Sequence, residues 1–121
     1  MMAPLARLVF ATCAVFAIGC SAPSPREQTT ASELAAMAPL KHEYPGIVMG
    51  FDVRNDSTVL VSLDLQTFIG MDDDAAAAMK QHVVQRWRVT WARANPGRHA
   101  LLHVRFIDFI GRTIAAETIR A

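Results

Sequence analysis

The chain has 121 residues, with twelve Lys or Arg against eleven Asp or Glu and a formal net charge of +1. A balance this close leaves no electrostatic footprint for nucleic acid or for an anionic lipid surface. No block of like charge is long enough to indicate a charged tail.

The first segment with a clear pattern is apolar. Arg7 is the only charge ahead of a run from Leu8 to Gly19 that holds no charge and no proline. About 20 apolar residues are needed to cross a bilayer as a helix, so this run is too short for a stable span. A positive residue, a short apolar core and small residues behind it are typical of a secretory signal, which we assign to residues 1–19.

The end of the signal indicates the kind of export. The sequence Ala17-Ile18-Gly19-Cys20 resembles the lipobox of bacterial lipoproteins, with alanine where leucine is usual. The resemblance implies that Cys20 becomes the first residue of the mature chain and carries a diacylglyceryl group and an N-acyl chain. Ser21 is not the aspartate of an inner-membrane retention signal, so this analogy favours the outer membrane, facing the periplasm. The alternative is ordinary cleavage after Ala22.

The cysteine count agrees with a lipid anchor. Cys13 lies in the apolar core and leaves with the signal, so the mature chain holds Cys20 alone. A lone thiol in an exported protein requires an explanation, and thioether lipidation supplies one. Three acyl chains, at ~0.8 kcal/mol per buried CH₂, anchor a protein effectively permanently. We therefore expect the membrane as a partner through Cys20.

Residues 20–44 are expected to form a flexible tether. They hold three prolines and a Gln-Thr-Thr-Ala-Ser run, with little apolar periodicity. The stretch from Ser32 to Ala38 could form a short helical turn capped by Ser32. The composition favours a flexible linker with nascent helix instead.

A β-hairpin is expected at the start of a domain spanning residues 45–121. Two runs of period-2 alternation are separated by Asn55-Asp56-Ser57. For both apolar sets to share a face, the turn must hold an odd number of residues, so we expect a three-residue loop. This register pairs Arg54 with Thr58, and its inward-facing pairs are Val53 with Val59, Phe51 with Val61, and Met49 with Leu63.

The clearest helix follows. Asp72 to Asp74 supply an N-cap and negative charge at its start, and Asn95-Pro96-Gly97 ends it. One apolar stripe recurs at spacings of three and four and predicts a buried face: Ala76, Met79, Val83, Trp87, Trp91 and Ala94.

A second hairpin is expected at the end of the chain. Asp108-Phe109-Ile110-Gly111 fits a type I turn, in which Gly111 can take the left-handed conformation. Asp108 then lies opposite Arg112, and the apolar pairs are Phe106 with Ile114, Val104 with Ala116, and Leu102 with Thr118. This register places His103 opposite Glu117.

The predicted fold is α+β, in the order β-β-α-β-β, with a four-stranded antiparallel sheet and one long helix packed on one face. About 75 residues are enough for one modest core. The order of a Tyr-Pro-Gly segment, two strands, a helix with Arg-Trp-Arg and a further strand is similar to the C-terminal domain of TonB-like energy-transducing proteins, over residues 44–106. The segment that this family carries between its Tyr-Pro and first strand is missing here, and a final strand is added.

Most candidate chemical sites have a structural explanation. Three consecutive aspartates do not match a calcium loop, which needs alternating ligands, a glycine and a distal glutamate. His99 and His103 would lie about 13 Å apart on a strand, too far to share a metal. The basic and aromatic residues from Arg86 to Arg93 have the texture of a nucleic-acid platform, but both tryptophans lie on the predicted buried stripe. No nucleophilic triad or phosphate loop is indicated, so we predict no catalytic residue, cofactor or metal.

One surface remains as a candidate site. The sheet face away from the helix is expected to carry Asp52, Arg54, Ser62, Asp64, Gln66, His103, Arg105 and Glu117, with Phe109 and Ile110 exposed at the adjoining turn. A self-paired, solvated face is the simpler interpretation. The alternative is a partner-binding surface formed by His103, Arg105, Phe109, Ile110 and Glu117, because mixed charge beside an apolar tip suits a protein interface.

Two functions fit these observations. The first is a lipid-anchored cell-envelope binding or scaffold module that presents its sheet face or an edge strand to another envelope protein. The second is a small lipid-anchored ligand-binding domain or enzyme with a pocket between helix and sheet. A fully packed helix–sheet interface favours the first, and a cavity lined by polar side chains favours the second.

Overall fold

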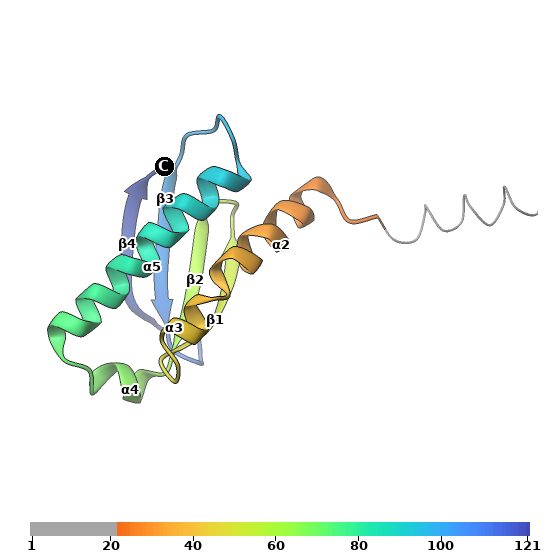
Figure 1. The fold of residues 1–121 in the computed structure, drawn as a ribbon. Coiled ribbons are helices and arrows are strands. Elements are labelled where there is room, and N and C mark those ends of the chain that lie inside the picture. The colour runs from red at the N-terminus through yellow and green to blue at the C-terminus, as the bar shows by residue number, and fades with distance from the viewer. Residues whose placement is uncertain (1–21) are drawn as a thin grey trace, which may run out of the picture.

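A computed structural model describes residues 22–121. The cysteine predicted to carry the lipid, Cys20, and the signal sequence lie outside these residues. Figure 1 shows a curved sheet with the longest helix lying across one face and a second helix running beside it. The elements, in chain order, are α2 (Pro25–Met37), α3 (Leu40–Glu43), β1 (Val48–Arg54), β2 (Thr58–Leu63), α4 (Leu65–Ile69), α5 (Asp73–Ala94), β3 (Leu101–Ile107) and β4 (Thr113–Arg120).

The α+β class, the four strands and the long helix on the sheet are confirmed, but the sheet is mixed. The strand order is β1-β2-β3-β4, and β2 pairs with β3 in parallel. The prediction of an all-antiparallel sheet is therefore wrong. The reason is the length of α5, whose 22 residues span about 33 Å and return the chain to the end where β2 began. A strand that starts there runs in the same direction as β2.

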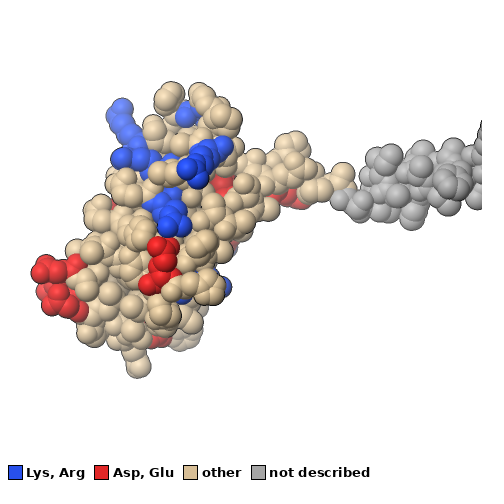
Figure 2. All heavy atoms as spheres, in the orientation of Figure 1, with Lys and Arg blue, Asp and Glu red and all other residues tan. Residues whose placement is uncertain are grey.

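Helix α5 begins and ends where its sequence signals lie. The side chain of Asp72 caps it by accepting a hydrogen bond from the backbone N–H of Asp74, and Asn95 is its C-cap. Figure 2 shows acidic side chains gathered at the start of this helix and basic ones toward its end, which complements the helix dipole.

The predicted apolar stripe of α5 forms the centre of the core. Met79, Val83, Trp87 and Trp91 are buried against the inward-facing residues of the sheet, which include Val59, Val61, Leu63, Leu102, Val104 and Phe106. Both tryptophans have no exposed surface. Their burial confirms the structural interpretation of the Arg86–Arg93 segment.

The first hairpin has the expected three-residue loop, with Arg54 opposite Thr58 and Val53 opposite Val59. A bulge between Val48 and Gly50 changes its far end. Val48, not Met49, lies opposite Leu63 and is buried, and Met49 is exposed. The predicted Met49–Leu63 pair is therefore wrong, because the bulge turns the methionine outward.

The segment predicted as a flexible tether holds two helices. Ser24 caps α2 by accepting a hydrogen bond from the backbone N–H of Glu27, and Pro25 occupies the first helical turn. The predicted cap at Ser32 is wrong, because this stronger start signal lies eight residues earlier.

The end of α2 packs against α5 and β1, and α3 packs against β1. Met37 and Leu40 are buried in the same core as the sheet. The core therefore extends ahead of the predicted boundary at residue 45, and the expectation of a flexible segment does not hold for residues 25–43.

Candidate functional site

The helices cover one face of the sheet, and no helix lies over the other face (Figure 1). Since Val59, Val61 and Leu63 of β2 are buried, the alternate side chains of this strand point to the opposite face. The same alternation applies to its neighbours. We call this surface the open face; it carries Asp52, Arg54, Thr58, Leu60, Ser62, His103, Arg105, Ile107, Thr113, Ala116 and Thr118.

Two residues expected on the open face do not lie on it. Strand β2 ends at Leu63, and the next residue, Asp64, caps α4 by accepting a hydrogen bond from the backbone N–H of Thr67. Gln66 belongs to that short helix. The alternating pattern predicted a longer strand, but β2 ends before Asp64 because this residue caps the helix that follows.

The open face is hollowed toward the end where β2 and β3 begin. A shallow depression of about 580 Å³ is lined by residues of all four strands or their turns, among them Arg54, Thr58, Leu60, His103, Arg105 and Thr118. Leu60 supplies apolar surface, and its neighbours supply hydroxyl, imidazole and guanidinium groups. This composition suits a polar interface that surrounds a small apolar centre.

The cations of this hollow differ in their partners. Arg54 forms an ion pair of 2.8 Å with Asp52 on the same strand. Arg105 donates a hydrogen bond of 2.6 Å to the Thr113 hydroxyl, and His103 Nδ1 lies 3.1 Å from the Thr118 hydroxyl oxygen. Within residues 22–121, neither Arg105 nor His103 is paired with a carboxylate. Arg105 is therefore a cation of the hollow that has no ion-pair partner among the described residues, although Glu117 also lines the hollow.

The predicted pair of His103 with Glu117 is wrong. A bulge between Phe106 and Ile107 shifts the β3–β4 register by one residue, so that His103 lies opposite Thr118 and Glu117 lies opposite the buried Val104. Glu117 is thus on the helix-covered side of the sheet, half-buried at its edge.

The bulge has a packing reason. Ile114 and Ile119 are five residues apart and would face opposite sides of a regular strand. In the structure both pack against the core. The extra residue therefore brings a second isoleucine against the core. It also removes Glu117 from the position opposite His103, while Glu117 still lines the hollow.

The turn between β3 and β4 has the predicted form. Asp108 and Arg112 face each other, and Gly111 has a φ of +86°. The buried Asp108 carboxylate accepts hydrogen bonds from the backbone N–H groups of Ile110 and Arg112 and from Arg112 Nε. Burial alone would raise the pKa of Asp108, but these hydrogen bonds outweigh it and hold the pKa below its ordinary value. The turn is therefore firmly held from within.

This turn presents an apolar tip. Phe109 is 90% exposed and Ile110 is 59% exposed. Leaving a phenylalanine in water costs hydrophobic free energy that burial against a partner would recover. Four of the five predicted partner-binding residues thus lie on one hairpin, with His103 and Arg105 in the hollow. Phe109 and Ile110 lie at its turn, about 13 Å along the strand from Arg105.

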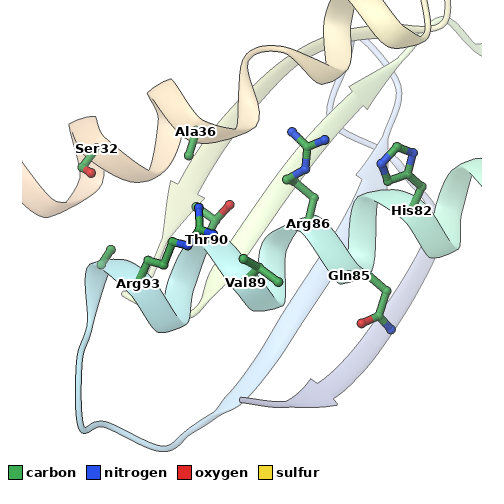
Figure 3. Close-up of a pocket in the computed structure, with 9 residues that line it drawn as sticks. Ser32, Ala36, His82, Gln85, Arg86, Val89, Thr90 and Arg93 are labelled. Atoms are coloured by element: carbon green, nitrogen blue, oxygen red, sulfur yellow. The ribbon is translucent and has the colours of Figure 1, made fainter.

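A second hollow lies between α2 and α5, where no site was predicted. Figure 3 shows this groove of about 520 Å³, with Ser32 and Ala36 on one helix facing a row of α5 side chains that includes His82, Arg86 and Arg93. Arg86 forms an ion pair of 3.2 Å with Glu43, and His82 Nδ1 lies 2.7 Å from the Tyr44 hydroxyl. These two groups hold the α3 region against α5. The groove was not predicted, because the start signal of α2 at Ser24 and Pro25 was not recognised.

Residues 22–121 contain no group of three or more His, Cys, Asp or Glu side chains that could hold a metal ion. No helix among them is long and apolar enough to cross a membrane. Comparison of the chain with family models, with curated proteins and with solved structures gives no match.

Proposed function

We propose that this protein is a lipid-anchored binding module of the bacterial cell envelope that docks an acidic segment of another envelope protein on its open face. The carrying observation is Arg105, which lines the hollow, has no carboxylate partner within residues 22–121, and lies on the same hairpin as the exposed apolar tip. A carboxylate of the partner would pair with the positive charge of the Arg105 guanidinium. The turn tip, Phe109 with Ile110, would supply the apolar contact.

The chemistry of the hollow supports an acidic partner. A guanidinium in a polar hollow binds a carboxylate by two parallel hydrogen bonds, which fixes orientation as well as charge. The hydroxyls of Thr58 and Thr118 line the same hollow, and that of Thr113 contacts the guanidinium; all three can donate to further oxygens. An exposed phenylalanine in a firmly held turn is a suitable interface anchor, because little conformational entropy is lost when it is buried.

The lipobox supports the anchor. If Cys20 carries the acyl chains, only residues 21–24 separate it from the first turn of α2. Four residues reach at most about 14 Å when extended. The domain would then stand close to the membrane on a helical stalk, and the outer membrane facing the periplasm is the location that Ser21 favours.

The structure gives less support to a ligand-binding pocket between helix and sheet. That interface is filled by large buried side chains, foremost Trp87, Trp91 and Phe106. The groove between α2 and α5 is the remaining place for a small ligand, and Arg93 would be its charged contact. A second candidate function is therefore a small-anion binding domain that uses this groove.

Site-specific photocrosslinking distinguishes the two surfaces. A photoreactive phenylalanine analogue would replace Phe109 in one full-length chain and Val89, a groove residue, in another. Both chains would be expressed in the native cells, so that the envelope partner is present. We expect a discrete protein adduct from position 109 and none from position 89. Adducts from position 89 alone would move the binding site to the groove and contradict the proposal.

A further inference from the structure

A buried carboxyl group joins α2 to the rest of the domain. Glu33 lies in the third turn of α2 and is only 1% exposed, although glutamate is rarely buried without a cationic partner. Together with Met37 it forms the buried part of this helix. The first two turns of α2 are largely exposed, so the contacts of Glu33 and Met37 largely determine whether α2 stays docked.

The partner of Glu33 is neutral. The side-chain amide of Asn95, at the end of α5, donates a hydrogen bond of 3.5 Å to one carboxyl oxygen of Glu33. The same amide nitrogen also donates to the backbone carbonyl of Trp91 at 2.9 Å. The amide nitrogen has two hydrogens and can donate one to each acceptor, but its bond to Glu33 is the longer and compensates an ionised carboxylate poorly.

Arg98, the cation that acts on Glu33, already pairs with other groups. Arg98 donates a hydrogen bond of 2.6 Å to the Asp56 carboxylate in the β1–β2 turn and another of 2.8 Å to Asn95 Oδ1. Its guanidinium also lies over the Trp91 ring, 5.3 Å from the centroid. Among residues 22–121, the charged groups that act on Glu33 are therefore the like charge of Asp56 and an Arg98 already paired with that aspartate.

Both burial and charge favour the protonated form of Glu33. Removal from water is the largest cause and the nearby Asp56 the next; they outweigh the hydrogen bond from Asn95 and the charge of Arg98, and the pKa of Glu33 rises from 4.5 to about 7. A neutral carboxyl fits this position, because it needs no counter-charge.

We propose that Glu33 makes the docking of α2 on α5 a pH-sensitive switch, in which the neutral carboxyl holds the helix in place and the ionised carboxylate releases it. Released, the 13-residue α2 loses the packing that stabilises it, since an isolated helix of this length is marginal in water. The segment ahead of the sheet would then change from a docked helix to a flexible tether, which alters how far the domain can move from its N-terminal attachment.

The sign of the switch follows from the direction of the pKa shift. Because the docked pKa lies above the ordinary value, docking is strongest below pH 4.5 and weakens as the pH rises toward 7. Above about pH 7 Glu33 is ionised whether α2 is docked or released, and its contribution to the docking free energy is fully lost. A shift of this size, if it arises wholly from docking, weakens the docking equilibrium by up to roughly 300-fold.

Hydrogen–deuterium exchange of the full-length protein tests the switch. The protection of α2 amides would be measured at pH 4.5 and pH 8 in the wild type, in Glu33→Gln and in Glu27→Gln. Glu27 is an exposed glutamate of the same helix and is the matched control. Because the chains are compared at the same pH, the intrinsic pH dependence of exchange cancels.

We expect α2 protection at pH 8 to be on the order of 100-fold higher in Glu33→Gln than in the wild type, because the amide cannot ionise. Glu27→Gln should match the wild type, and β2 and β3 amides should be equal in all three chains. Glu33→Met provides a second test, since an apolar side chain of similar length should also keep α2 protected at pH 8. Wild-type protection at pH 8 equal to that of Glu33→Gln and Glu33→Met would overturn the proposal, as would loss of protection in all chains.

Discussion

The indole N–H of Trp91 donates a hydrogen bond of 2.9 Å to the backbone carbonyl of Asp56, which fastens α5 to the β1–β2 turn. Trp87 does the same one helical turn earlier, with a bond of 3.2 Å to the carbonyl of Ser57. The turn needs such support, because Asn55 and Asp56 both adopt positive φ values. The two tryptophans are thus at once core residues and turn clamps.

Replacement of these tryptophans should separate the two roles. Trp91→Phe keeps most of the buried ring and removes the donor, so we expect a loss of about 1–3 kcal/mol. Trp87→Ala removes the ring as well and should cost about 3–5 kcal/mol. Denaturant titration of the full-length chain measures both. An unchanged midpoint for Trp87→Ala would contradict its place in the core.

Lipidation at Cys20 is tested by substitution. Cys20→Ala removes the thiol that the lipobox places at the processing site, so incorporation of labelled palmitate and processing at that site should both cease. Cys13→Ala is the matched control, because that cysteine lies within the signal and should leave labelling intact. Labelling that persists in Cys20→Ala would show that another residue carries the lipid.

Glu117 should protect the free edge of the sheet. Strand β4 is an edge strand, and a charge that points inward on such a strand opposes pairing with another chain. We therefore expect Glu117→Val to increase self-association, measured by sedimentation velocity. Ala116→Val raises β-propensity on the other face of the same strand and should remain at the wild-type oligomeric state. Equal behaviour of the two variants would remove this role from Glu117.

The β3–β4 turn should weaken in acid. Since the pKa of Asp108 is held below its ordinary value of 3.8, its stabilising effect is present above that pH and is lost as the pH falls through the lowered pKa. The denaturation midpoint of the wild type should therefore fall more steeply below pH 4 than that of Asp108→Asn. The variant should start lower at pH 6, because its amide cannot accept all the hydrogen bonds of the carboxylate. Parallel pH profiles would contradict this origin of the turn's rigidity.

Local signals were sufficient for the two hairpin turns and for α5. Asp72 and Asn95 bound the helix, and three-residue turns follow from alternation around Asn55 and Gly111. Each of these features depends on residues close together in the chain.

The features that were not predicted depend on distant contacts. Helix α2 has a weak apolar pattern, and its stability comes from Met37 and Glu33 meeting α5 and the loop after it. The bulge that moves Glu117 is favoured because Ile114 and Ile119 both reach a core formed by other elements. Alternation along one strand cannot reveal such a preference. The hairpin that carries the candidate site was therefore predicted, but the pairing of its charged residues was not.

The most direct test of the proposed function is capture of an envelope partner by the full-length protein from membranes of the cells that produce it, quantified by mass spectrometry. The double variant Arg105→Glu with Phe109→Ser alters the open face and its tip, and neither side chain lies in the core. Arg88→Glu with Val89→Ser makes the same chemical changes on exposed positions of α5. We predict that at least one protein with an acidic segment is captured by the wild type and by the α5 variant and is lost from the open-face variant. Capture that survives in a folded open-face variant would contradict the proposed role of this surface.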